Sequence, residues 1–164
     1  MECDFSEYKY KLKVMFVCHG NICRSPMAEL LFKDMLKKKG LAGIITVASA
    51  GTSAEELGNP VHHGTKNLLA ELGIDVAGKY AVKLNSSDYN AYDWFLGMDS
   101  ANIRNMNRIF SGDPLKKVRS LLDFTSSPRD IADPWYTGDF KQTYRDILEG
   151  LQAFFDSEIP VKHV

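Results

Sequence analysis

The chain has 164 residues, 45% of which are hydrophobic, and this is enough for one globular domain with a substantial core. Its 20 basic and 21 acidic residues leave a formal charge of −1, so the net charge gives no reason to expect nucleic acid or an anionic membrane surface as a partner. No apolar run reaches the roughly 20 residues that span a bilayer, and the three cysteines favour free thiols in a reducing cytoplasm over a secreted disulfide scaffold.

The N-terminal residues 1–11 mix acidic and basic side chains without an apolar core, so they predict a short extension rather than a signal peptide. Residues 12–17 (LKVMFV) are apolar and rich in β-branched and aromatic side chains, which predicts a buried strand. A helix should follow, with Ser25 at the N-cap, Pro26 at its first position and Gly40 as its C-terminal stop. Its apolar residues recur at helical spacing: Met27, Leu30, Leu31, Phe32 and Met35.

Strands and helices continue to alternate along the rest of the chain. The predicted elements are a strand at 44–49, a helix at 63–73, a strand at 92–98, a helix at 101–110 capped by Asp99 or Ser100, a weaker strand at 117–122 and a helix at 140–155. Because no repeat or long linker interrupts this order, residues 12–164 are predicted to form a single domain. The alternation predicts right-handed crossovers and a parallel sheet with helices on both faces. Ligands of such folds bind beyond the carboxyl ends of the strands.

The loop CHGNICRS, residues 18–25, lies at the end of the first predicted strand. Successive backbone N–H groups in a tight loop, together with a helix N-terminus, form an anion-binding site. Gly20 and Asn21 tolerate unusual backbone angles, and Arg24 offers a planar fork for two phosphate oxygens. The loop therefore predicts a phosphate site with the sulfur of Cys18 at its base.

The same positive field favours the thiolate form of Cys18, which is the nucleophilic form. The hydroxyl of Ser25 is placed to donate a hydrogen bond to that thiolate or to the leaving-group state. This combination suggests covalent catalysis, in which Cys18 attacks phosphorus and water later hydrolyses the cysteinyl-phosphate.

A proton donor for the leaving oxygen is available in the segment IADPWYTGDF, as Asp133. A carboxylic acid protonates the leaving group and then, as a carboxylate, accepts a proton from the attacking water. Trp135 and Tyr136 are candidates for an apolar wall against an aromatic leaving group. The alternatives are that Asp133 serves only as a helix cap or ion-pair partner, and that the two aromatic residues are ordinary packing.

The Cys-x5-Arg-Ser loop that opens into PMAE, together with DPWY at 133–136, resembles the low-molecular-weight protein tyrosine phosphatases. The stretches ASAGTS (48–53), LGNP (57–60) and GMDSANIRNM (97–106) are also similar to this family, so the resemblance covers nearly the whole chain from Lys13. It implies an α/β, flavodoxin-like three-layer sandwich with a four-stranded parallel sheet. It further implies hydrolysis through a phosphocysteine, with no metal and no cofactor.

The resemblance also assigns roles to single residues. Cys18 is similar to the family's nucleophile, Arg24 to its phosphate clamp and Asp133 to its general acid. Cys23 resembles a second cysteine that forms a disulfide with the nucleophile under oxidation, although a simple packed thiol is an equal alternative. The other phosphate-loop and supporting positions carried over are His19, Gly20, Asn21, Ile22, Ser25 and Ser49.

Two positions depart from the family pattern. Glu55 stands where many members have an aromatic residue that lines the cleft, and the resulting acidic rim is expected to disfavour acidic peptides. Lys79 aligns with a histidine that, in some members, braces the loop asparagine. These departures affect the expected specificity and leave the expected hydrolysis chemistry in place.

The sequence also bears on four alternatives to a tyrosine phosphatase. Arsenate reductases of this fold need cysteines downstream, and none follows Cys23; arginine phosphatases of the family typically have threonine at the position of Ile22. A non-catalytic phosphate-binding module would be expected to lack the nucleophile or the acid. A zinc site is disfavoured because the remaining candidate ligands have no recognised metal spacing; these are Cys3, His62, His63 and His163.

The sequence therefore predicts a cytoplasmic protein tyrosine phosphatase that acts on phosphotyrosine and aryl phosphates. Phosphate and other oxyanions are expected to inhibit it. The expected partners are phosphotyrosine proteins or peptides, with no nucleic acid, and the expected assembly state is a monomer or a weak dimer.

Overall fold

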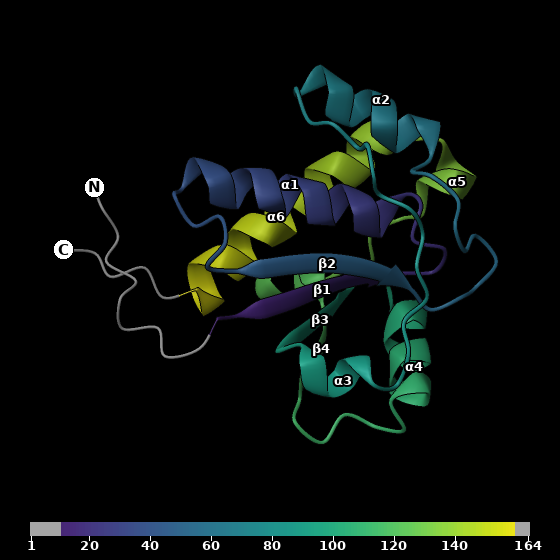
Figure 1. Cartoon of the computed structure of the whole chain (residues 1–164), viewed down its shortest axis with the longest axis vertical. Coiled ribbons are helices and arrows are strands. Elements are labelled where there is room, and N and C mark those ends of the chain that lie inside the picture. The colour runs from purple at the N-terminus through teal and green to yellow at the C-terminus, as the bar shows by residue number, and fades with distance from the viewer. Residues whose placement is uncertain (1–10, 160–164) are drawn as a thin grey trace.

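Four parallel strands form one sheet, in the spatial order β2-β1-β3-β4 (Figure 1). The computed structural model describes residues 11–159. Its elements are β1 (Lys13–Cys18), α1 (Arg24–Lys38), β2 (Thr46–Gly51), α2 (His63–Glu71), α3 (Asp88–Ala91), β3 (Trp94–Gly97), α4 (Ser100–Ile109), β4 (Val118–Ser120), the 3-10 helix η1 (Leu121–Phe124), α5 (Pro134–Thr137) and α6 (Phe140–Glu158).

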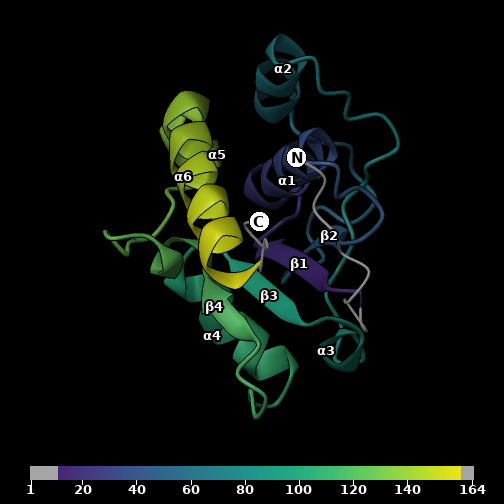
Figure 2. The same cartoon turned by 90° about the vertical axis from the view of Figure 1, so that its left-hand side faces the viewer.

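Helices cover both faces of the sheet, so the predicted three-layer α/β sandwich is confirmed (Figures 1 and 2). On one face, α1 and α6 pack on Val14 and Phe16 of β1. The ring of Phe32 joins this layer, lying 5.7 Å edge-on from Phe16 and 6.0 Å from Phe154. On the other face, Met15 and Val17 pack with residues of α3 and α4. A strand covered on both faces needs an unbroken apolar run, which explains the composition of β1.

The start of α1 differs from its prediction. The helix begins at Arg24 with Cys23 as its N-cap, and no side chain caps it, so the prediction of Ser25 as N-cap and Pro26 as first residue is wrong. The physical reason is that the Ser25 hydroxyl is used by the loop, where it contacts Cys18 and Asn21. Of the two predicted caps of α4, Asp99 and Ser100, the structure has Asp99, which forms a reciprocal capping box with Asn102.

Other element boundaries differ from the predictions in smaller ways. β2 lies two residues later than the predicted strand 44–49, and β4 covers only the middle of the predicted strand 117–122, which continues as a 3-10 turn. The final helix extends to Glu158, whereas α2 ends earlier than predicted, at Glu71. The short helices α3 and α5 were not predicted, because four residues are too few to show helical periodicity.

Part of the predicted domain organisation lies outside the described residues. The expected N-terminal extension 1–11 falls there except for Lys11, as do residues 160–164 of the predicted domain. Two of the candidate zinc ligands, Cys3 and His163, also lie outside the described residues. Within residues 11–159, no helix combines the length and apolar character that a membrane span requires.

Candidate active site

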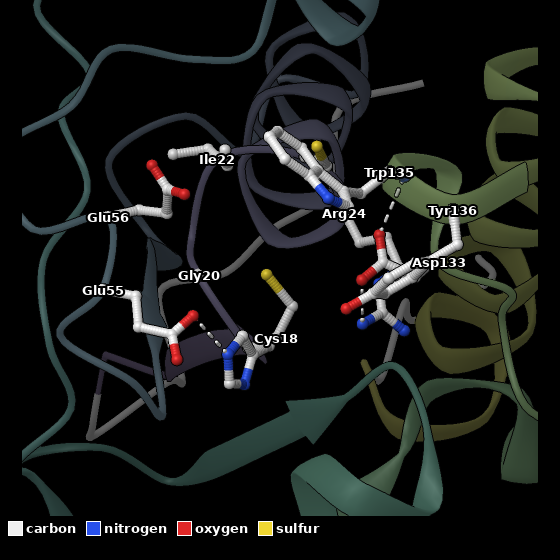
Figure 3. A pocket seen from close by; sticks show the side chains of 11 residues that line it. Cys18, Gly20, Ile22, Arg24, Glu55, Glu56, Asp133, Trp135 and Tyr136 are labelled. Atoms are coloured by element: carbon white, nitrogen blue, oxygen red, sulfur yellow. Dashed lines mark hydrogen bonds and ion pairs between the residues drawn. The ribbon is translucent and has the colours of Figure 1, made fainter. Parts of the chain in front are cut away.

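The loop between β1 and α1 forms the floor of a hollow of about 140 Å³ at the carboxyl end of the sheet (Figure 3). Asn21 takes a left-handed conformation with φ 59°, which lets its backbone N–H approach the Cys18 sulfur at 3.3 Å. The sulfur, Arg24 and Asp133 all border this space (Figure 3). The full lining is Cys18, His19, Gly20, Ile22, Cys23, Arg24, Glu55, Glu56, Asp133, Trp135 and Tyr136.

A series of linked hydrogen bonds supports the Cys18 sulfur. The Asn21 side-chain oxygen accepts from the N–H of Val82 at 3.0 Å, which turns its amide nitrogen toward two hydroxyls. That nitrogen donates to Ser25 at 2.8 Å and to Ser49 at 2.9 Å. Because Ser25 already accepts one hydrogen bond from Asn21, its own hydrogen is free for the Cys18 sulfur, 2.9 Å away. Such a donor favours the thiolate.

This series of hydrogen bonds ends at the buried carboxylate of Glu29, which accepts from the Ser49 hydroxyl at 2.6 Å. Burial alone would raise the pKa of Glu29, but hydrogen bonds from Lys33 and Ser49 and the charge of Lys79 outweigh it and lower that pKa. An ionised carboxylate only accepts, so Ser49 must donate to it and must receive from Asn21. The charge of Glu29 thus fixes the direction of the Ser49 hydrogen bond, and the N–H of Val82 fixes that of the Asn21 amide.

Lys79, which departs from the histidine that braces the loop asparagine in some members of the family, forms no hydrogen bond with Asn21. Its ammonium lies 3.3 Å from Glu29 and donates to the backbone oxygen of Ser49 at 3.1 Å. It therefore acts on the loop indirectly, through the carboxylate and β2. Sequence reasoning missed Glu29; the available signal was an acidic residue on the helix face that carries the apolar spacing.

Arg24 is almost completely buried, and three acceptors orient its guanidinium. One nitrogen, Nη1, donates to Asp99 at 2.6 Å and to the backbone oxygen of Ile131 at 2.9 Å, while Nη2 lies 3.4 Å from Asp133. Burial would lower the pKa of Arg24, but the charges of Cys18, Asp99 and Asp133 leave it raised, so the group stays cationic. This fixed fork is suited to bind two oxygens of a phosphate.

Asp99 is a second residue that sequence reasoning placed only as a helix cap. Its Oδ1 accepts from the N–H of Asn102 at 2.8 Å, as predicted, and its Oδ2 holds Arg24. The β3–α4 junction therefore fixes the arginine of the β1–α1 loop. Only the packing of β3 beside β1 brings these two segments together, so no local pattern could have indicated the contact.

Asp133 lies across the hollow from Cys18, at the N-cap of α5 (Figure 3). Its Oδ1 accepts from the N–H of Trp135 at 3.1 Å, and Oδ2 faces Arg24. The cap and ion-pair alternatives for Asp133 are thus present, and they hold the carboxyl at the hollow. Trp135 and Tyr136 are 56% and 84% exposed and border the hollow, so they are not core packing.

The opposite rim carries His19 and Glu55, whose side chains meet at 3.2 Å and are both exposed. Gly51 of β2 supports the loop from behind. A Cβ there would lie 2.6 Å from the His19 backbone oxygen, so only glycine allows the loop to lie this close to β2. The N–H groups of Thr52 and Ser53 then bond the loop carbonyls of Cys18 and His19 at 2.9 and 3.0 Å.

Cys23 is buried beside the loop, and both cysteines within the described residues, Cys18 and Cys23, are free thiols. Burial, followed by the negative charges of Cys18 and Asp133, raises the pKa of Cys23 to about 12. The thiol form of Cys23 therefore predominates throughout the neutral range, so this residue is a poor nucleophile.

This pKa predicts selective alkylation. At about pH 8 the thiolate fraction of Cys23 is only about one part in ten thousand, because its pKa is about 12. Iodoacetamide should therefore label Cys18 and spare Cys23 in a Cys3→Ser background, as read by peptide mass spectrometry. Inorganic phosphate should slow the labelling. Comparable labelling of Cys23, in the same folded protein, would contradict the prediction.

Comparison with known proteins shows the family of this chain. Residues 13–162 match the family model described as low molecular weight phosphotyrosine protein phosphatase. The protein YfkJ of Bacillus subtilis, a low molecular weight protein-tyrosine-phosphatase, is 38% identical over 148 residues, covering 89% of this chain and 95% of that protein. A low molecular weight phosphotyrosine protein phosphatase of Schizosaccharomyces pombe is 37% identical over 151 residues, covering 89% of this chain and 96% of that protein.

Solved structures show the same fold. The crystal structure of YfkJ superimposes with a TM-score of 0.88 at 36% identity, covering 92% of this chain and 96% of that one. A Drosophila arginine phosphatase has a TM-score of 0.82 at 26% identity, covering 91% of this chain and 99% of that one. The family match extends over nearly all of the sequence, and the chain belongs to the low molecular weight protein tyrosine phosphatase family of hydrolases.

Proposed function

We propose that the protein hydrolyses phosphotyrosine, and aryl phosphates in general, through a phosphocysteine intermediate. The observation that supports this most directly is that the Cys18 sulfur, the Arg24 guanidinium and the Asp133 carboxyl border one small hollow. Arg24 and the loop N–H groups bind the phosphate oxygens and stabilise the charge of the transition state. This scheme uses no metal and no cofactor, and inorganic phosphate and similar oxyanions should compete with substrate.

The first step forms the bond between the Cys18 sulfur and phosphorus and breaks the bond from phosphorus to the tyrosine oxygen. Asp133, as a carboxylic acid, gives its proton to that oxygen, so neutral tyrosine leaves. In the second step a water attacks phosphorus, and the Asp133 carboxylate takes its proton. Phosphate leaves, and the Cys18 thiolate is restored with the Ser25 hydrogen bond in place.

An aromatic substrate fits the composition of the hollow. Trp135 and Tyr136 form one wall, against which a phenyl ring can pack. Ile22 borders the same space, and at its position arginine phosphatases of the family typically have threonine. Phosphoarginine is nevertheless the alternative substrate to test, because the Glu55 carboxylate at the rim could pair with a guanidinium.

The decisive experiment compares phosphotyrosine, phosphoserine and phosphoarginine in peptides of otherwise identical sequence, hydrolysed by one preparation. We expect kcat/KM for phosphotyrosine to exceed the other two by at least about a hundredfold, which corresponds to the contacts that only an aromatic ring makes. Faster hydrolysis of phosphoarginine would replace the proposed substrate. No hydrolysis of any peptide would reject the proposal.

A further prediction concerns the ion pair between Glu29 and Lys79. In Glu29→Gln the neutral amide leaves the Lys79 ammonium, which is mostly buried, without its carboxylate partner, while Asn21 still donates to Ser25. Removing one partner of a buried ion pair costs about 3–5 kcal/mol, so we expect the free energy of unfolding to fall by about that amount. Denaturant unfolding measures this directly.

Lys33→Met provides the matched control for Glu29→Gln. It removes the more exposed of the two lysines that contact Glu29 and leaves the carboxylate in place, so the free energy of unfolding should be nearly unchanged. Equal unfolding free energies in wild type and Glu29→Gln would show that the pair of Glu29 with Lys79 does not stabilise the fold.

A further inference from the structure

The mouth of the catalytic hollow is acidic. Glu55 and Glu56 stand on one side and Asp133 on the other, separated by the Cys18 sulfur (Figure 3). Arg24 is the sole lysine or arginine among the residues that line this hollow, and it is buried against Asp99 and Asp133. The inner end of the site is therefore built for a phosphate, whereas its outer edge presents carboxylates.

The two glutamates differ in how they are held. The Glu55 side chain is 73% exposed, and one oxygen, Oε2, contacts His19. Glu56 is half-buried: its Cγ would be 3.1 Å from a Cβ at Gly20, and its Oε2 accepts from the Asn59 amide at 2.6 Å. Glu56 is thus fixed against the phosphate-binding loop, while Glu55 is free to turn toward a ligand at the rim.

A second hollow, of about 550 Å³, continues from the first on the side of Glu56. The two share Ile22, Glu56 and Trp135, and the second extends between residues 59–63 and 76–80. A peptide whose phosphotyrosine enters the first hollow and whose chain continues along the second must pass Glu56. Lys66 lines the second hollow, so the acidic influence is confined to the mouth.

We infer that this protein selects phosphotyrosine that has lysine or arginine next to it, with Glu55 and Glu56 as the specificity-determining residues; this inference rests on the proposed function. A basic side chain at that position gains one or two exposed ion pairs, and an acidic one meets repulsion. Exposed ion pairs are worth 0.2–1 kcal/mol, which is about 1.5- to 5-fold each, so a lysine peptide should exceed its glutamate counterpart by about tenfold.

The test uses phosphotyrosine peptides that differ only in the residues flanking the phosphotyrosine, which are lysine, glutamine or glutamate. The measured quantity is the ratio of kcat/KM between the lysine and glutamate peptides. We expect a ratio of about ten for the wild type and about two for the double variant Glu55→Gln/Glu56→Gln. High salt should lower the wild-type ratio, because exposed pairs are screened.

The control is Glu71→Gln, at the end of α2, where the carboxylate lines a separate hollow between α2 and α6. This variant should keep the wild-type ratio. Equal rates on all three peptides, or a ratio that survives in the double variant, would overturn the inference. Failure of the proposed function has a different signature, since the wild type would then hydrolyse neither the peptides nor p-nitrophenyl phosphate.

Discussion

Cys18→Ser should abolish turnover, with kcat on p-nitrophenyl phosphate lowered by at least about ten thousandfold. The reason is chemical, because a serine hydroxyl is hardly ionised at neutral pH, whereas the cysteine sulfur receives hydrogen bonds from Ser25 and the Asn21 N–H and lies near the Arg24 cation. The serine is nearly isosteric and fits the same contacts, so the fold should persist. Steady-state hydrolysis and thermal unfolding, measured together, separate these two effects.

Cys23→Ser is the matched control, because it makes the same change at the neighbouring thiol. Its kcat should stay within about tenfold of wild type, since Cys23 is held as a neutral thiol by its raised pKa of about 12. Rapid acid quenching of the wild type should also trap phosphate on Cys18 and not on Cys23. Full activity in Cys18→Ser would rule out the phosphocysteine mechanism.

Asp133→Asn should lower kcat/KM for a phosphotyrosine peptide by about a hundredfold to ten thousandfold, the usual contribution of a general acid. The loss on p-nitrophenyl phosphate should be much smaller, because nitrophenolate leaves without a proton. Asparagine keeps the side-chain oxygen that caps α5 through the N–H of Trp135, so the loop geometry should survive. The dependence of the loss on the leaving group is therefore the signature of lost acid catalysis.

Asp130→Asn is the control for Asp133→Asn. It tests whether loss of another carboxylate, three residues earlier in the sequence, lowers kcat/KM in the same way. Asp130 is exposed and bonds the N–H and hydroxyl of Ser100 at 3.1 and 2.9 Å, and it does not line the hollow. Its replacement should change neither substrate by more than about twofold, as is usual for a surface position. Equal losses on both substrates in Asp133→Asn would contradict the acid role and indicate a loss of geometry.

Features that depend on neighbouring residues were accessible from the sequence. The apolar run of β1, the loop from Cys18 to Arg24 that we propose binds phosphate, the cap at the start of α4 and the DPWY segment are local patterns with local physical causes. Because the order of strands and helices restricts the possible topologies, the parallel sheet was also predictable. That sheet brings Asp133 to the same edge as Cys18, although over a hundred residues separate them.

The tertiary structure alone decided which side chains hold these groups in place. Asp99 holds Arg24 as well as capping α4, and Glu29 accepts the hydrogen bond of Ser49 behind the loop, because β1, β2, β3 and α1 pack side by side. The same packing explains why Ser25 is not the N-cap of α1. Its buried hydroxyl forms hydrogen bonds with Cys18 and Asn21 instead. Local sequence thus determined the groups that we propose react, whereas contacts between distant segments determined their orientation and electrostatic surroundings.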